Sequence, residues 1–235
     1  MQHLDALPPN RPGWECFGAA GDGGLVSGLP IAWAPGSGAT NFPAGTGLKL
    51  AKGEHLVIQV HYSLAAVADP KSLVDRTKIK LQLVDKVGRE AFMVLHDQFV
   101  FSAFTGKPES LTPGLTSSLY NWTATLATLD FWVPATAGKQ FDLFGVFPHM
   151  HKRGRKMKLT IQQPGKEAEC MADVPRWGFD WQQLYLFDKP LPFDDKTVLR
   201  ATCDYDTSDT QKPVLAGFGT DNEMCMFGMY LAVRK

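Results

Sequence analysis

Hydrophobic and polar residues alternate with a period of two over many short stretches of this chain, and no long stretch repeats with the 3.6-residue period of a helix. The 22 glycines and 16 prolines are scattered between these stretches, where they favour turns. A period of two places successive side chains on opposite faces of a strand. The pattern therefore predicts an all-β protein with little helix.

The first part of the chain contains two predicted strands. In residues 55–64, aliphatic and aromatic side chains share one face, and the opposite face carries Gln59 and His61. In residues 75–84, aliphatic residues again alternate with polar ones. Residues 1–47 are rich in turn-forming residues and are expected to form mostly loops.

A boundary is expected at residues 85–88, which divides the chain into residues 1–86 and residues 87–235. Alternating patterns resume after this point, with a turn at residues 134–139. Within the second part, strands are predicted in residues 92–104, 118–133, 140–151, 197–205 and 224–233.

Length, composition and charge exclude several classes of protein. The 235 residues, of which 44% are hydrophobic, are enough to bury one or two cores. A formal net charge of +0 provides no general attraction for nucleic acid or for an anionic membrane, so neither is expected as a partner. No apolar run is long enough for a transmembrane segment, and the first residues lack the basic and apolar regions of a signal peptide.

His149 and His151 are the first candidates for chemistry. Two side chains separated by one residue point to the same face of a strand, with Cα atoms roughly 6 to 7 Å apart. One metal ion can be held by both imidazoles. The alternative is a strand that carries two hydrogen-bonded histidines without a metal.

Met224 lies in a second, strand-like stretch near the end of the chain. Imidazole nitrogens combined with a thioether sulfur are a typical ligand set for copper, because soft sulfur favours Cu(I). The alternative is a methionine that packs in the core. We expect His149, His151 and Met224 to hold a redox-active copper ion.

The order of these motifs along the chain resembles a known family. The motifs are Gln59-Val60-His61-Tyr62, His149-Met150-His151, Cys203 and Glu223-Met224-Cys225. They resemble those of the bacterial-type copper type II, ascorbate-dependent monooxygenases, the family of peptidylglycine α-hydroxylating monooxygenase and dopamine β-monooxygenase. The resemblance extends from about Gly13 to the end of the chain.

The resemblance implies a fold and a division of labour. The fold would be two antiparallel jelly-roll-like β-sandwiches, of which the first is incomplete. Residues 1–86 would form the partial N-terminal sandwich, the half that holds an electron-transfer copper. Residues 87–235 would form the C-terminal sandwich, which carries the oxygen-binding copper.

The resemblance also implies that His61 is a ligand of the electron-transfer copper. The other two ligands of that copper come from an adjacent pair of histidines in the family, and this chain has no such pair. Another chain or a lost N-terminal segment would then supply them. The alternative for His61 is a hydrogen-bonded histidine on the surface of a strand.

Positions near the copper ligands distinguish this chain from the peptide-hydroxylating branch. Phe147 stands where that branch has an arginine for a substrate carboxylate, so the C-terminus of a peptide is not the expected substrate. Gln59, Met226 and Gly228 are the other expected contacts of the substrate. The implied pocket is apolar.

The implied activity is hydroxylation of a C–H bond of a small organic substrate, with O2 and a reductant such as ascorbate. A non-catalytic copper-binding or ligand-binding β-sandwich that has lost the second copper site is the alternative. A third possibility is a β-sandwich that binds no metal at all.

Four cysteines are present, and none forms a Cys-x-x-Cys motif, so disulfides are favoured over a zinc ribbon. The resemblance implies that Cys203 pairs with Cys225, behind the strand that carries Met224. No partner is assigned to Cys16 or Cys170. Such a bridge predicts a periplasmic or extracellular location.

Two further patterns lie near the candidate ligands. The basic residues in 152–158 could steer an anion toward the metal, or they could form a solvated turn that leads into a strand with Met157, Leu159 and Ile161 facing inward. The aromatic side chains of Trp177, Phe179 and Trp181 would share one side of an extended segment, either as a stacking platform or as part of a core or pocket wall.

Overall fold

The computed structural model describes residues 13–14, 32–53, 56–62, 68–69, 72–129 and 140–234, which form a mostly β protein with three sheets. The prediction of a β protein with little helix is confirmed for this part of the chain, and the jelly-roll topology stays a prediction. The strands are β1 (Thr46–Leu48), β2 (Arg89–His96), β3 (Ser110–Leu111), β4 (Ser118–Ala124), β5 (Gln140–His149), β6 (Gly154–Gln162), β7 (Ala168–Val174), β8 (Tyr185–Asp194), β9 (Val198–Tyr205), β10 (Val214–Leu215) and β11 (Met226–Val233).

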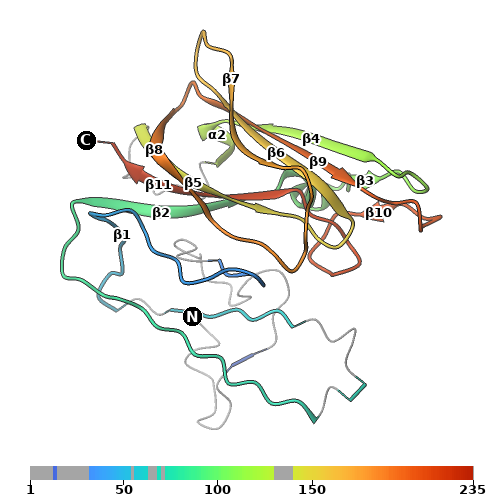
Figure 1. Ribbon diagram of the computed structural model, residues 1–235, viewed down its shortest axis with the longest axis horizontal. Helices are drawn as coiled ribbons and strands as arrows, with labels where there is room; N and C mark the ends of the chain where they lie inside the picture. Colours follow the sequence, from blue (N-terminus) through green and yellow to red (C-terminus); the bar gives the residue numbers. More distant parts are fainter. Residues whose placement is uncertain are drawn as a thin grey trace.

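Two larger sheets and a short two-stranded sheet make up the fold of the described residues (Figure 1). The five-stranded sheet has the order β1-β2-β11-β5-β8, and the four-stranded sheet has the order β4-β9-β6-β7. The third sheet pairs β10 with β3. Every pairing is antiparallel except that of β1 with β2.

The main hydrophobic core lies between the two larger sheets. Alternate residues of β11, such as Phe227 and Met229, are fully buried in this core together with Leu159 of the four-stranded sheet. The rings of Trp122 and Phe227 stack across it, with centroids 4.8 Å apart. The prediction that Met157, Leu159 and Ile161 face inward is confirmed, because all three are buried in the same core.

The opposite face of the five-stranded sheet is covered in part by the N-terminal half of the chain (Figure 1). Tyr230 of β11 points to this face, where its ring stacks on Phe42 with centroids 4.6 Å apart. Leu48 of β1 packs against the same small cluster. Since β1 pairs with β2, backbone hydrogen bonds join residues 1–86 to residues 87–235 at this edge.

The strands predicted at residues 55–64 and 75–84 are wrong for the residues that the structure describes. Residues 56–62 and 73–84 are irregular, and their apolar side chains are exposed, for example Ile58 at 59% and Leu83 at 75%. Alternation indicates a half-buried strand only if a second strand pairs with the first and a layer covers its apolar face. No strand among the described residues pairs with these segments.

Helix replaces part of two other predicted strands. After β2, the chain forms α1 (Gln98–Ser102) and a 3₁₀ turn, η2 (Ala103–Thr105), instead of continuing to residue 104. Asp97 begins α1, since its Oδ1 accepts a hydrogen bond from the Val100 N–H at 3.0 Å. After β4, the chain forms α2 (Leu126–Leu129). No helix in the described residues is long and apolar enough to span a bilayer.

The strands predicted within residues 140–151, 197–205 and 224–233 are confirmed as β5, β9 and β11. β8 was not predicted, since it contains Pro190 and Pro192, which are unusual in a central strand. Its position explains them, because β8 is the last strand of the five-stranded sheet and an edge strand needs fewer donors.

The disulfide between Cys203 and Cys225 is confirmed. Cys203 lies in β9 and Cys225 directly precedes β11, so the bridge links the two larger sheets through the core. Cys170 is a free, exposed cysteine on β7, and Cys16 lies outside the described residues.

Loss of this bridge should lower stability. It closes a loop with a sequence separation of 22, so Cys203→Ala combined with Cys225→Ala should cost about 3 kcal/mol of unfolding free energy, measured by urea denaturation. Cys170→Ala is the matched control and should change the free energy by less than about 0.5 kcal/mol, because its side chain is exposed. Equal stability of the double variant and the control would contradict a stabilising bridge.

Candidate metal centre

His149 and His151 come together at the end of β5. His149 is the last residue of the strand and is half-buried, and His151 lies in the following turn and is buried. Their ring centroids are 5.3 Å apart with the planes nearly perpendicular, at 88°. Met150, between them, points the other way into the core. The predicted pairing of the two imidazoles on one side of the chain is thus what the structure contains.

Hydrogen bonds define the protonation of both rings. His149 Nδ1 lies 2.6 Å from Gln182 Oε1, and His151 Nδ1 lies 2.9 Å from the backbone oxygen of Asn222. The Gln182 side chain is held in this orientation because its Nε2 donates to the Phe179 oxygen at 2.6 Å. Both partners are acceptors, so each Nδ1 carries the proton and each Nε2 keeps a lone pair for a metal ion.

Burial keeps the two rings neutral. Removal from water and, to a smaller extent, the neighbouring His151 together lower the pKa of His149 to about 4. Burial also lowers the pKa of His151. Neutral imidazole is the form that binds a metal ion, so both rings are ready to do so without first losing a proton.

Glu223 connects the turn that carries His151 to the residue Met224. Its buried carboxylate accepts hydrogen bonds from the backbone N–H groups of His151 at 2.9 Å, Arg153 at 2.7 Å and Met224 at 3.3 Å. Burial raises the pKa of Glu223 to about 7, although these N–H groups oppose the rise. The sequence motif contained this residue, but no local pattern indicated its role.

The backbone around Met224 is held at each peptide group. The oxygen of Met224 accepts a hydrogen bond from the Tyr205 hydroxyl at 2.7 Å. The N–H of Cys225 donates to Asp97 Oδ2 at 3.1 Å, and its oxygen accepts from Trp122 Nε1 at 2.8 Å. Met224 itself is buried. The residue that supplies the predicted sulfur ligand is therefore rigidly placed next to the His151 turn.

Two histidines alone are a small ligand set. Among the described residues, no group of three or more His, Cys, Asp or Glu side chains lies close enough to hold a metal ion. A copper ion at His149 and His151 would thus need a ligand of another kind, and the thioether of Met224 belongs to the soft class that Cu(I) prefers. The residues present fit copper better than a hard cation.

His61 lies close enough to affect both rings. It is exposed and outside any strand, and its charge contributes to the lowered pKa of His149 and of His151. Gln59 is also exposed in the same irregular segment. The structure thus places this segment on the side of the candidate ligands without joining His61 to them.

The other predicted substrate contacts lie beside His149 on the five-stranded sheet. Met226 is opposite His149 and Gly228 is opposite Phe147 in the β5–β11 register. The rings of Phe147 and His149 are nearly parallel, with centroids 6.5 Å apart. A Cβ atom on Gly228 would lie 2.6 Å from Leu95 Cδ2, so neighbouring side chains fill the space above this glycine.

The aromatic residues after β7 partly enclose His151. The segment is not a strand in the structure, so its three rings do not share one side of an extended run. Trp177 Nε1 donates to the His151 oxygen at 3.1 Å, and the Phe179 ring meets the His151 ring edge to face at 6.3 Å. Trp181 is 65% exposed. Two of the three aromatic residues therefore form a wall of the candidate site.

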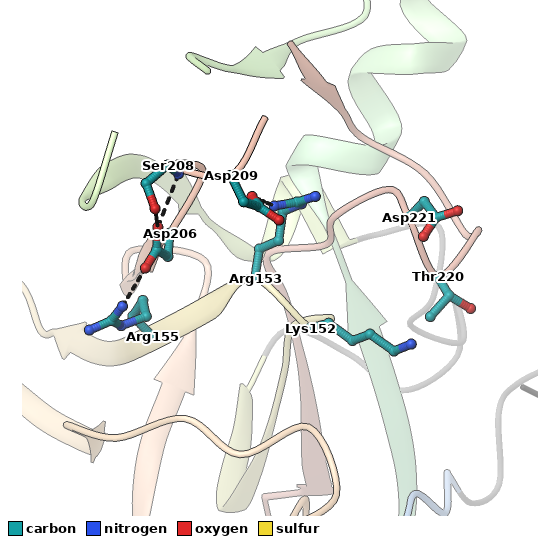
Figure 2. A pocket seen from close by; sticks show the side chains of 8 residues that line it. All are labelled: Lys152, Arg153, Arg155, Asp206, Ser208, Asp209, Thr220 and Asp221. Carbon is teal, nitrogen blue, oxygen red and sulfur yellow. Dashed lines mark hydrogen bonds and ion pairs between the residues drawn. The ribbon is translucent and has the colours of Figure 1, made fainter. Parts of the chain in front are cut away.

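Three of the basic residues after His151 line a cavity of about 470 Å³ (Figure 2). Figure 2 shows that Arg153 points to Asp209 and Arg155 to Asp206, and both pairs are ion pairs. The cavity lining carries three basic and three acidic side chains, which are Lys152, Arg153, Arg155, Asp206, Asp209 and Asp221. Because these charges balance, the cavity provides no strong field for steering an anion to the metal.

Glu223 should leave a signature in the pH dependence of stability. In the unfolded chain the pKa of Glu223 is 4.5, whereas burial raises it to about 7 in the folded protein. Between these two pH values the folded state binds more protons than the unfolded state. Glu223 therefore makes the unfolding free energy fall as pH rises. Glu223→Gln removes this effect. Its unfolding free energy should rise relative to that of the wild type by up to ~1.4 kcal/mol per pH unit from pH 5 to 7.

Urea unfolding at several pH values measures this difference. Glu167→Gln is the matched control, since Glu167 is exposed just before β7. This variant should show the same pH dependence of stability as the wild type. Curves for Glu223→Gln and the wild type that run parallel from pH 5 to 7 would contradict the elevated pKa.

Comparison with known proteins shows which sequences this chain resembles. Residues 133–233, which contain both histidines, Met224 and the disulfide, match the family model described as "Copper type II ascorbate-dependent monooxygenase, C-terminal domain". Proteins named DBH-like monooxygenase protein 1 are 23% identical over 199 residues in Gallus gallus and 25% identical over 202 residues in Homo sapiens. Dopamine beta-hydroxylase of Homo sapiens is 24% identical over 198 residues.

These alignments cover most of this chain but a minor part of each relative. Each includes 83% of this chain and 31% or 32% of the relative, so the chain spans about a third of the length of these proteins. Residues 133–233 therefore correspond to the C-terminal domain of the copper type II ascorbate-dependent monooxygenases, and most of the chain is distantly related to dopamine beta-hydroxylase.

Proposed function

We propose that this protein is a copper-dependent monooxygenase that hydroxylates a C–H bond of a small organic substrate with O2 and a reductant such as ascorbate. One observation carries the proposal. Two adjacent, neutral imidazoles have their Nδ1 atoms engaged by Gln182 and Asn222, which leaves both Nε2 atoms available for a metal ion.

In this proposal, His149, His151 and Met224 hold the copper. When bound, copper supplies one-electron redox chemistry and an open coordination position for O2. Two electrons from the reductant and two protons balance the reaction, in which one oxygen atom enters the C–H bond and the other leaves as water. Met224 favours the reduced ion, because a thioether is a soft ligand.

The other residues of the site orient the two histidine rings and enclose them. Gln182 and Asn222 hold the two rings by their Nδ1 protons, so each ring presents the same nitrogen to the metal. Glu223 holds the His151 turn at a constant position relative to Met224. Phe147 and Phe179 place apolar rings beside the two histidines and exclude water from that side.

An uncharged, apolar substrate suits the face beside His149. Phe147 and Met226 occupy the β-sheet positions next to this ring, Leu95 covers Gly228 beside them, and none of these residues carries a charge. A carboxylate placed there would lose its hydration without gaining a cationic partner. Gln59, from the exposed segment with His61, is the proposed polar contact.

The domain organisation and the second copper belong to the same proposal. Residues 1–86 and 87–235 would correspond to two jelly-roll-like sandwiches, the first incomplete, with His61 as one ligand of an electron-transfer copper. Another chain or a lost segment would add the remaining histidines. The disulfide and the family together favour a location outside the cytoplasm, periplasmic or extracellular.

A second candidate is a copper-binding or ligand-binding β-sandwich without catalytic activity. It is favoured by one observation, since the six histidines of this chain include no adjacent pair that would complete a second copper site with His61. The two candidates differ in the number of bound copper ions and in whether O2 is consumed.

Copper content, EPR and O2 uptake test the proposal together. The copper-loaded protein should consume O2 only when both ascorbate and an oxidisable substrate are present. His149→Ala should abolish this uptake and weaken copper binding by more than the ~10–100-fold that loss of a supporting hydrogen bond costs. Trp181→Ala, which removes an exposed side chain, is the control and should retain both properties.

His61→Ala separates the two candidates. In the monooxygenase it should stop turnover and leave the copper at His149 and His151 in place, as seen by EPR. In the non-catalytic protein it should leave the copper content unchanged, and neither the variant nor the wild type should consume O2. Full copper content and full turnover in His149→Ala would refute the ligand assignment.

A further inference from the structure

A tight turn in the N-terminal half of the chain packs directly on the residue that orients His149. The turn consists of Pro35, Gly36 and Ser37, and it is closed by a hydrogen bond from the Ser37 N–H to the Ala34 oxygen at 3.0 Å. Trp33 Nε1 donates to the Ser37 oxygen at 3.0 Å and braces the turn from one side. The partner on the other side is the loop that contains Gln182.

All four polar groups of Gln182 form hydrogen bonds. The two backbone groups bind the turn at residues 35–37, and the two side-chain groups bind His149 and Phe179. Its N–H donates to the Pro35 oxygen at 2.9 Å, and its backbone oxygen accepts from the Ser37 hydroxyl. Its side chain accepts from His149 Nδ1 and donates to the Phe179 oxygen, each at 2.6 Å. Gln182 is only 2% exposed, so water does not compete for these groups.

Gly36 makes this contact possible for two independent reasons. Its φ of +88° lies in the region that residues with a Cβ atom rarely adopt. A Cβ atom there would also lie 2.7 Å from Trp181 Cα and 2.8 Å from the Asp180 oxygen, which are backbone atoms that cannot rotate away. The turn thus approaches the loop at 180–182 as closely as two backbones can.

These contacts form a short chain from the first part of the sequence to the metal centre. The turn fixes the backbone of Gln182, and the side chain of Gln182 fixes the tautomer and the plane of His149. The Gln182 side chain cannot rotate freely to follow its backbone, because its Nε2 is bound to the Phe179 oxygen. A shift of the Gln182 backbone by roughly a few tenths of an ångström would therefore lengthen the hydrogen bond to His149 Nδ1.

We propose that the turn at residues 35–37 is a positioning element for His149, so that the N-terminal half of the chain sets the geometry of a metal ligand in the C-terminal half. The part of the inference that concerns copper rests on the proposed function. The part that concerns the orientation of His149 does not, since it describes hydrogen bonds of the metal-free protein.

Gly36→Ala tests the inference, and Gly38→Ala is the matched control. Gly38 lies two residues away, and a Cβ atom there would meet nothing within 4 Å. The first readout is the long-range ¹H–¹⁵N NMR spectrum of the metal-free protein with ¹⁵N-labelled histidine, with the His149 signals assigned from His149→Ala. The second readout is Cu(I) affinity measured by competition with a chelator.

The wild type and Gly38→Ala should show His149 protonated at Nδ1. Gly36→Ala should show a mixture of the two tautomers and a Cu(I) affinity about tenfold lower, the effect expected when a ligand loses its orienting hydrogen bond. A folded Gly36→Ala protein with the wild-type His149 signals and the wild-type affinity would overturn the proposal.

Ser37→Ala keeps the test decisive if Gly36→Ala does not fold. This variant removes only the hydroxyl that donates to the Gln182 oxygen, and it should shift the His149 signals in the same direction by a smaller amount. Unchanged signals would overturn the proposal in this variant too. If the signals shift but the wild type neither binds copper nor consumes O2, the proposed function fails while the positioning role of the turn stands.

Discussion

The candidate metal centre depends on one buried carboxylate. Burying the charge of Glu223 is costly, and three backbone N–H groups from two segments offset that cost by donating to it. One segment is the turn after β5, which contains His151 and Arg153, and the other is the short stretch before β11 that contains Met224. Because the same carboxylate needs donors from both, the position of His151 and the position of Met224 are determined together.

The surrounding structure makes this arrangement rigid. The antiparallel register of β5 and β11 places Met226 opposite His149, and the disulfide holds Cys225 to β9 behind it. Tyr205, Asp97 and Trp122 bind the peptide groups on either side, each from a different part of the chain. A metal site gains affinity and selectivity when its ligands are held before the metal arrives, so this rigidity suits a soft-metal centre.

The sequence pattern predicted the strands that lie between two layers and failed where no second layer is present. β9 and the first half of β5 alternate and are covered on their apolar faces, as the period of two requires, whereas β11 is apolar and buried on both faces. Residues 56–62 alternate equally well and remain irregular. Alternation indicates which side chains would face a core if the segment were extended. The segment forms a sheet only when its backbone pairs with another strand. The helix after Asp97 was missed because its capping signal stands beside an apolar run.

By itself, the sequence determined that His149 and His151 lie on one side of the chain, because two residues separated by one share a face of an extended segment. The tertiary structure decided which nitrogen each ring offers. The acceptors for the two Nδ1 atoms, Gln182 and Asn222, are 33 and 71 residues away, and hydrogen-bond partners at such separations are brought together by the register and packing of whole segments. Periodicity describes only a residue's immediate neighbours, so it contains no information about those partners.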